Sequence, residues 1–296
     1  MALGDFIPEG TVQSRLLCEE ISKRSDGVCI LALSRGKDIL GNWIWLTQFF
    51  PTIYPFHAAS APNLGIANRS LSYYEDFFGC KIDRYLNGET SMGLQWKMYQ
   101  PLGRYERLEN LKRETYGLEE MAEVIRKKYN CPQAYMAIGQ SMNDNIFRRL
   151  QLKAVDQEGN LTFEKAMKKY QKTFYPCFDW TMSSLMEAIT KNGLALPEDY
   201  LLADRSLSPI LNAKNSERLM ELYPEDFEKC VQLFPLIKAV WARNQFRRMK
   251  ISGNGVIPRK VSEILKEDRL ERLEQELENA RNSNERKPGK RLANRG

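Results

Sequence analysis

The sequence predicts an α/β protein built on a doubly wound parallel sheet, with a helical, basic C-terminal extension. Short apolar runs rich in β-forming residues alternate along the chain with segments of helical periodicity, as in folds where helices connect parallel strands. The run VCILAL (28–33) is apolar throughout. Such a run is typical of a strand that is buried on both faces of a sheet.

Helices and strands follow one another in a regular order. Residues 10–24 predict an amphipathic helix that buries Val12, Leu16, Leu17 and Ile21, because these positions share one helical face. After the strand at 28–33 and a short loop, a helix is expected to about residue 50. The further predicted elements are a strand in TIYPFHA (52–58), a helix in SLSYYEDFFG (70–79), a strand in CKIDRYL (80–86), a helix in GLEEMAEVIRKKYN (117–130), a strand in AYMAIG (134–139) and a helix over 181–192.

Composition places the chain among folded globular proteins. It has 296 residues, 43% of them hydrophobic, with 18 Gly and 13 Pro, which is enough apolar material for a sizeable core. No apolar run is long enough to span a membrane, and the first residues lack the basic-then-apolar order of a signal peptide. We expect a cytoplasmic protein with no membrane contact. Residues 88–116 are polar and aromatic without a clear period, and we interpret them as an excursion or lid.

Cysteine and histidine usage argues against several kinds of site. The cysteines stand singly, without a C-x-x-C pair, so reduced thiols are favoured over a zinc site or an iron–sulfur cluster. His57 is the only histidine and lies in the apolar stretch TIYPFHAAS. It is interpreted as a buried strand histidine. The six cysteines are Cys18, Cys29, Cys80, Cys131, Cys177 and Cys230.

The loop between the first strand and the next helix has the composition of a phosphate cradle. Backbone N–H groups at the start of a helix, together with the helix dipole, favour a bound anion. Ser34 adds a hydroxyl, Gly36 permits close approach and Lys37 adds a charge. Asp38 is suited to Mg²⁺ bridging two phosphates, or to capping the helix. The loop is not a Walker motif, since G-x-x-x-x-G-K-S/T is absent.

Three segments resemble one known superfamily in the expected order. LALSRGKD (31–38) resembles the S-x-G-K-D-S/T pyrophosphate loop of the adenine nucleotide alpha hydrolase-like (HUP) superfamily, in particular its phosphoadenylyl sulfate reductase-like branch. GQSMNDNIFRR (139–149) and YPCFDWTMSSLMEAITKNGLALPEDY (175–200) resemble two later segments of that branch. The similarity is strongest to members found in bacteriophages and mobile elements.

The resemblance implies a Rossmann-like HUP fold that binds ATP or a related adenylate. The residues carried over from its motifs surround the polyphosphate, and Asp38 is the expected ligand of Mg²⁺. These site residues are Ser34, Arg35, Gly36, Lys37, Asp38, Gly139, Asp144 and Arg148.

The chain also departs from the family pattern. Ile39 stands where the family has Ser or Thr, Ser141 where it has Arg, and Asn145 where it has Ser. Loss of a hydroxyl and a guanidinium weakens polyphosphate binding by about 2–4 kcal/mol. The C-terminal catalytic cysteine motif of sulfonucleotide reductases is missing, and Cys177 is expected to be a core thiol. We therefore expect no thiol-based reductase activity.

Positive charge gathers near the C-terminus. Residues 238–260 carry seven Lys and Arg and residues 286–296 carry five, with no acid in either segment, so a nucleic acid or another polyanionic partner would be met at this end. Between them, residues 258–283 predict an exposed helix with one apolar seam. The residues predicted to contact nucleic acid are Arg243, Arg247, Arg248, Lys250, Arg286, Lys287, Lys290 and Arg291.

The predicted domains are an N-terminal helix (1–24), an adenine nucleotide alpha hydrolase-like domain (25–235) and a basic helical extension with a disordered tail (236–296). The sequence leaves three functions open. In the first, the chain binds an adenine nucleotide and cleaves ATP between its α and β phosphates or transfers adenylyl. In the second, it is a catalytically degenerate scaffold that binds nucleic acid or a protein through its basic end. A third, a nucleotide-modifying enzyme acting on DNA or RNA, would combine both features.

Overall fold

The structure is a computed structural model, and it describes residues 11–59, 61–87, 115–203, 213–233 and 236–239. All of these belong to one unit, residues 1–241. The segment interpreted as a lid lies almost wholly outside the described residues, as do the predicted C-terminal helix and tail.

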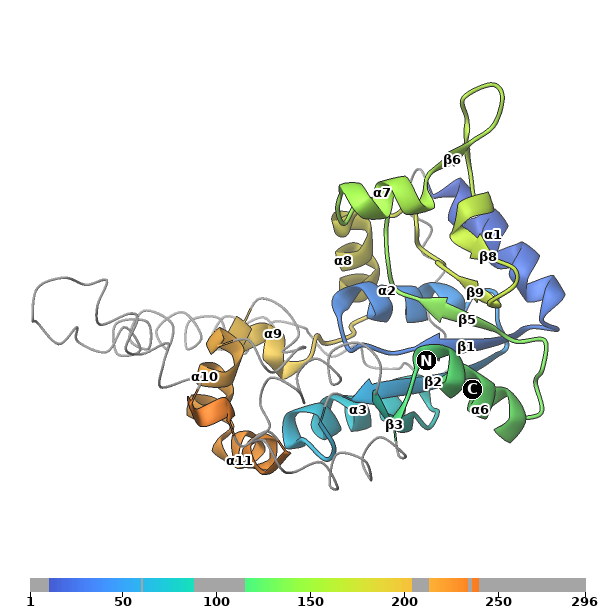
Figure 1. The fold of residues 1–296 in the computed structure, drawn as a ribbon. Helices are drawn as coiled ribbons and strands as arrows, with labels where there is room; N and C mark the ends of the chain where they lie inside the picture. Colours follow the sequence, from blue (N-terminus) through green and yellow to red (C-terminus); the bar gives the residue numbers. More distant parts are fainter. Residues whose placement is uncertain (1–10, 60, 88–114, 204–212, 234–235, 240–296) are drawn as a thin grey trace, which may run out of the picture. The chain divides into compact units, whose positions relative to one another are not determined.

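A seven-stranded sheet in the order β4-β3-β2-β1-β5-β9-β8 forms the centre of this unit (Figure 1). Every neighbouring pair is parallel except β8 and β9. From β1 the chain winds outward through β2, β3 and β4, and then returns to the other side of β1 with β5 and β9. The strands of the sheet are β1 (Val28–Ala32), β2 (Thr52–Ala59), β3 (Asp83–Asn87), β4 (Thr115–Tyr116), β5 (Tyr135–Ile138), β8 (Met167–Lys168) and β9 (Thr173–Phe174).

This order is that of a doubly wound α/β fold, as the sequence predicts. Strand β1 is buried on both faces. Cys29 and Leu31 belong to one hydrophobic cluster, whereas Ile30 belongs to a second cluster on the opposite side. The alternation of side chains along a strand explains this split.

Helices cover both faces of the sheet. Residues of α2 and α8 pack in the cluster around Cys29 and Leu31, and residues of α6 pack in the cluster around Ile30. In the part of the chain that the structure describes, none of these helices combines the length and the apolar character needed to cross a membrane. The helices are α1 (Val12–Arg24), α2 (Lys37–Leu46), α3 (Gly65–Phe78), α6 (Leu118–Lys128), α7 (Ile146–Leu152), α8 (Met182–Lys191), α9 (Glu198–Ala203), α10 (Ala213–Leu222) and α11 (Pro224–Leu233).

Helix α2 is held firmly in this core. A Cβ on Gly41 would lie 2.7 Å from the Leu185 side chain of α8, so the missing side chain lets the two helices approach closely. The Trp45 and Trp180 rings meet edge to face at 5.1 Å, and the Trp43 ring stacks on Phe78 at 3.8 Å. The start of α2 therefore has a well-defined position.

The buried face of α1 differs from the predicted one. Leu17 and Ile21 are buried as expected, but Val12 and Leu16 are exposed. Ser14 is buried instead, because its hydroxyl and its backbone N–H both bind the Asp179 carboxylate. The hydrogen bonds to Asp179 thus orient the first turns of α1 so that Ser14 faces the protein interior and Val12 and Leu16 face solvent.

The other predicted elements are confirmed with shifted ends. Helix α3 begins at Gly65, five residues before the predicted start, and ends at Phe78; its C-cap is Gly79, whose φ of 67° suits glycine. Strand β3 begins three residues later than predicted. Helices α9, α10 and α11 and the antiparallel hairpin of β6 (Ala154–Val155) and β7 (Leu161–Thr162) were not predicted.

Candidate functional site

The predicted phosphate loop lies at the topological switch point of the sheet. Strands β1 and β5 are neighbours, and the chain leaves them toward opposite edges. In open α/β sheets the crevice at the carboxyl ends of such a pair is where ligands bind. The loop after β1 (33–36) and the loop after β5 (139–145) both lie at this place.

The loop after β1 leads directly into α2. Arg35 has a φ of 63°, a left-handed conformation that costs a non-glycine residue about 1 kcal/mol. Gly36 is the N-cap of α2, with φ −73° and ψ 156°. Its N–H lies 3.4 Å from the Ser34 hydroxyl oxygen. The loop thus turns sharply and leads directly into the first turn of α2.

The Arg35 side chain is an internal brace of this loop. Its guanidinium is buried, and it donates to the Ser70 hydroxyl at 3.0 Å and to the Asp199 carboxylate at 3.3 Å. Ser70 belongs to α3 and Asp199 to α9. Arg35 therefore ties the loop to two helices.

His57 supports the same loop from β2. Its Nδ1 lies 2.7 Å from the Leu33 carbonyl oxygen, so this nitrogen carries the proton and donates it. Burial, together with the nearby Arg35 charge, lowers the pKa of His57 to about 4. The ring is a neutral buried strand residue, as the sequence predicts.

Lys37 and Asp38 form the first turn of α2. The Lys37 N–H donates to the Tyr200 hydroxyl at 3.0 Å, and the Lys37 ammonium lies 3.3 Å from the Asp38 carboxylate. Burial raises the pKa of the Asp38 carboxyl, and the charge of Asp144 adds to the rise while Lys37 opposes it. The described residues contain no group of three or more metal-binding side chains, so Asp38 would supply Mg²⁺ with one protein ligand, and phosphates and water would supply the rest.

Gly139 and Ile39 join the two loops. A Cβ on Gly139 would lie 2.9 Å from both the N and Cα atoms of Ile39, so only glycine lets the second loop approach the start of α2 this closely. The Ile39 side chain is 1% exposed and belongs to the core. The position where the family has a hydroxyl is therefore filled here by core packing.

Ser141 anchors the second loop to the YPCFDW element. Its hydroxyl lies 2.7 Å from the Trp180 carbonyl oxygen, and its N–H donates to the Asp144 carboxylate at 2.9 Å. Asn145 caps α7 by accepting from the Arg148 N–H at 3.0 Å. Ser141 and Asn145 thus have structural roles in place of the family's Arg and Ser.

Asp144 is exposed and Arg148 is partly exposed. The Arg148 guanidinium donates to Gln151 within its own helix at 2.9 Å. The structure thus brings Gly139 and Asp144 to the loop after β1 and places Arg148 one helical turn further along.

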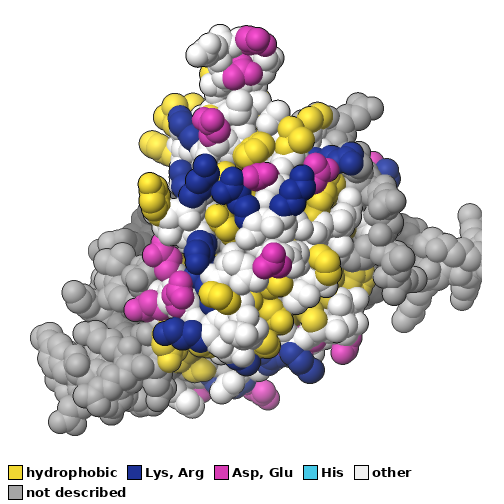
Figure 2. Space-filling model, turned by 90° about the vertical axis from the view of Figure 1, so that its right-hand side faces the viewer, with side chains coloured by type: hydrophobic (Ala, Val, Ile, Leu, Met, Phe, Trp, Pro, Cys, Tyr) yellow, Lys and Arg dark blue, Asp and Glu magenta, His cyan; other side chains and the backbone are white. Residues whose placement is uncertain are grey.

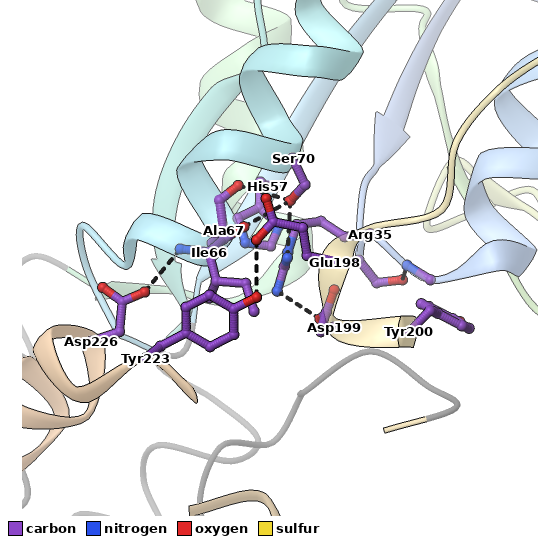
Figure 3. A network of polar contacts seen from close by, with 12 residues as sticks. Arg35, His57, Ile66, Ala67, Ser70, Glu198, Asp199, Tyr200, Tyr223 and Asp226 are labelled. Atoms are coloured by element: carbon purple, nitrogen blue, oxygen red, sulfur yellow. Dashed lines mark hydrogen bonds and ion pairs between the residues drawn. The ribbon is translucent and has the colours of Figure 1, made fainter. Parts of the chain in front are cut away.

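Helix α9 closes the other side of the loop (Figure 3). Glu198 binds Arg69 of α3 with both carboxylate oxygens, at 3.1 and 2.9 Å, and accepts from the Tyr223 hydroxyl at 3.0 Å. The bond with Arg69 lowers the pKa of Glu198. Sequence reasoning missed the contacts of Asp199 and Tyr200, although both lie in the quoted stretch GLALPEDY.

Asp226 of α11 fills the N-terminus of α3. Its two oxygens accept from the Gly65 and Ile66 N–H groups at 2.7 and 2.8 Å. Burial raises the pKa of Asp226, but the two N–H groups and Lys229 outweigh it and lower the pKa. The N-terminus of α3, which could attract an anion as the start of α2 can, is thus already occupied by the Asp226 carboxylate.

The residues predicted to contact nucleic acid lie outside the described residues. Figure 2 shows the right-hand side of the view in Figure 1. There, Lys and Arg side chains gather in a band across the upper part of the described surface, with hydrophobic side chains dispersed among them. All six cysteines are free thiols. Cys177 is 1% exposed and burial raises its pKa, as expected for a core thiol.

The solved structures that this chain resembles share 10–12% of its sequence. No protein-family model matches the chain, and no curated protein matches it. Among solved structures, the phosphoadenylyl-sulfate reductase from Candida auris has a TM-score of 0.36 and 10% identity, over 66% of this chain and 92% of that one. The NH3-dependent NAD synthetase from Campylobacter jejuni has a TM-score of 0.36 and 11% identity, over 79% and 93%. The U34-tRNA thiolase from Methanococcus maripaludis has a TM-score of 0.38 and 12% identity, over 76% and 78%.

Proposed function

We propose that the chain binds an adenine nucleotide, ATP or a related adenylate, at the crevice between the loops after β1 and β5. The observation that carries the proposal is the position of the SRGKD loop, at the start of α2 and at the switch point of the sheet. The order of the three motifs that resemble the phosphoadenylyl sulfate reductase-like branch adds to it.

The charges of the site fit a polyphosphate. The amides at the start of α2 and the Lys37 ammonium attract anions. The space beside the Gly36 Cα atom is open to a ligand. A Cβ placed there would meet nothing closer than the Ser34 hydroxyl, at 3.4 Å. Asp38, with Asp144 near it, would hold Mg²⁺, which would neutralise charge on the phosphates. With these parts, the chemistry we propose is cleavage between the α and β phosphates or adenylyl transfer.

A thermal-shift screen tests nucleotide binding. The full chain is heated with ATP, AMP or adenylyl sulfate, each with and without Mg²⁺. We expect ATP to raise the melting temperature, and Mg²⁺ to increase that rise, since a ligand that binds only the folded state stabilises it. Equal melting temperatures in every condition would contradict the proposal.

The basic C-terminal segments favour a second function. Twelve Lys and Arg in two acid-free segments would bind a nucleic acid through its phosphates and without sequence preference. In this case the nucleotide site would be a degenerate remnant and the chain a scaffold. A gel-shift titration with duplex DNA is expected to show affinity falling with salt, with a log–log slope of roughly −4 to −8. Absence of binding at low salt would remove this candidate.

A further inference from the structure

Tyr200 presents a hydroxyl group to the start of α2 from a distant part of the sequence. The Lys37 N–H donates to this hydroxyl at 3.0 Å. The hydroxyl also lies 3.7 Å from the place that a Cβ on Gly36 would take. It therefore stands over the loop that would hold the polyphosphate.

The position of this hydroxyl is fixed by its neighbours in α9. Glu198 is bound to Arg69 of α3, and Asp199 is 0% exposed and paired with Arg35 of the loop. Three consecutive residues thus bind α3, the loop and the start of α2. Groups that are held by such contacts on rigid elements are well suited to bind a ligand.

The hydrogen bond from Lys37 leaves the tyrosine proton available. A phenol hydroxyl can accept hydrogen bonds and donate one. Among the described residues, the Lys37 N–H is the hydrogen-bond partner of this hydroxyl, and in that bond the oxygen accepts. The O–H is thus a donor at the mouth of the loop, and ionised phosphates offer only acceptors.

We infer that Tyr200 is a ligand-contacting residue of the proposed site, whose hydroxyl accepts from the Lys37 N–H and donates to an oxygen of the ligand's pyrophosphate part. This inference rests on the proposed nucleotide site and names which part of the ligand Tyr200 recognises. The hydroxyl binds a phosphate oxygen and does not contact the nucleoside part of the ligand. It therefore favours ATP and inorganic pyrophosphate over adenosine.

Tyr223→Phe is a matched control for Tyr200→Phe. The Tyr223 hydroxyl binds Glu198 at 3.0 Å, so its removal perturbs the same helix without touching the loop. Each substitution deletes one hydroxyl and leaves the ring in place. A difference between the two variants thus reports on the contact at the loop and not on the placement of α9.

The test is calorimetric titration of the full chain and both variants with ATP, inorganic pyrophosphate and adenosine, in the presence of Mg²⁺. We expect Tyr200→Phe to lose about tenfold in affinity for ATP and for pyrophosphate, with adenosine unchanged, since a hydrogen bond to a charged group is lost. Tyr223→Phe is expected to change affinity by less than about twofold.

Three results would overturn the inference while leaving nucleotide binding intact. They are wild-type affinity in Tyr200→Phe, tighter binding in Tyr200→Phe because the hydroxyl competes with phosphate for the Lys37 amide, and equal losses in both variants. A wild-type chain that binds neither ATP nor pyrophosphate would instead overturn the proposed function. Thermal unfolding of both variants checks that they are folded.

Discussion

The two loops at the switch point differ in where their charged side chains point. The loop after β1 turns its arginine inward, where Arg35 is 6% exposed and paired with Asp199. The loop after β5 leaves Asp144 exposed, and Arg148 of α7, the helix that follows this loop, is partly exposed. Arg35 is thus paired within the fold, whereas Arg148 stays at the surface and donates to Gln151 of its own helix. A motif therefore gives the residue types at a site but not which of them are free to bind.

The largest expected effect is the loss of the buried guanidinium. Arg35→Met removes the partner of a carboxylate that is 0% exposed, and breaking such a pair costs roughly 3–5 kcal/mol of the free energy of unfolding. Arg148→Met, in the helix that follows the other loop, is the matched control and is expected to change the free energy of unfolding by no more than about 0.5 kcal/mol. Urea denaturation of both variants measures the difference. Similar losses in the two variants would show that the loops do not differ in this way.

His57 makes the first loop sensitive to acid. Its pKa is about 4 in the folded chain, against about 6.5 in the unfolded chain. Between these values the unfolded state binds more protons, so stability rises with pH and falls as the solution is acidified from pH 6.5 to pH 4. The loss at pH 4 is expected to be roughly 3 kcal/mol.

The control for this effect is His57→Gln, which can still donate to the Leu33 carbonyl oxygen. Denaturation curves of both proteins across the range give the difference in slope. An identical pH dependence in the two proteins would refute the assignment to His57.

A smaller effect is expected where the two loops meet. Gly139→Ala places a Cβ 2.9 Å from the Ile39 backbone, so the chain must shift and the free energy of unfolding should fall by roughly 1–3 kcal/mol. Gly36→Ala meets only ordinary contacts and has a φ of −73°, so it is expected to be neutral or to stabilise by about 0.5 kcal/mol. Chemical denaturation distinguishes the two, and equal stabilities would contradict the described contact.

The sequence predicts strands β1, β2, β3 and β5 and most of the helices that cover them, because their signals are local, whereas β4, β8 and β9 were not predicted. The apolar run at 28–33 and the helical period of 118–128 each depend on neighbouring residues. The helices after residue 197 were missed, since their formation depends on long-range bonds such as those from Asp226 to the start of α3. Likewise, Arg35 is held inside the fold by its bond to Asp199, which lies 164 residues away in the sequence. Local sequence therefore does not show that its guanidinium is paired.

Site residues were predicted from motifs alone, so only their identities and order were available. Ile39 shows the limit of that approach. It departs from the loop motif that this segment resembles, but its burial against Gly139 follows from how β5 and α2 pack. The hydrogen bond from the Lys37 N–H to the Tyr200 hydroxyl joins residues 163 positions apart. The local sequence shows only that Tyr200 ends the segment GLALPEDY.

The central claim is that the loop at Ser34–Asp38 binds the polyphosphate of a nucleotide, and calorimetry with ATP and Mg²⁺ tests it most directly. The wild-type chain is expected to bind with a dissociation constant between about 10 µM and 1 mM. Gly36→Val and Lys37→Ala should remove the heat of binding, because one fills the approach to the loop amides and the other removes the mobile charge, while thermal unfolding shows both variants still folded. No heat with the wild-type chain, or the same affinity in all three proteins, would contradict the claim.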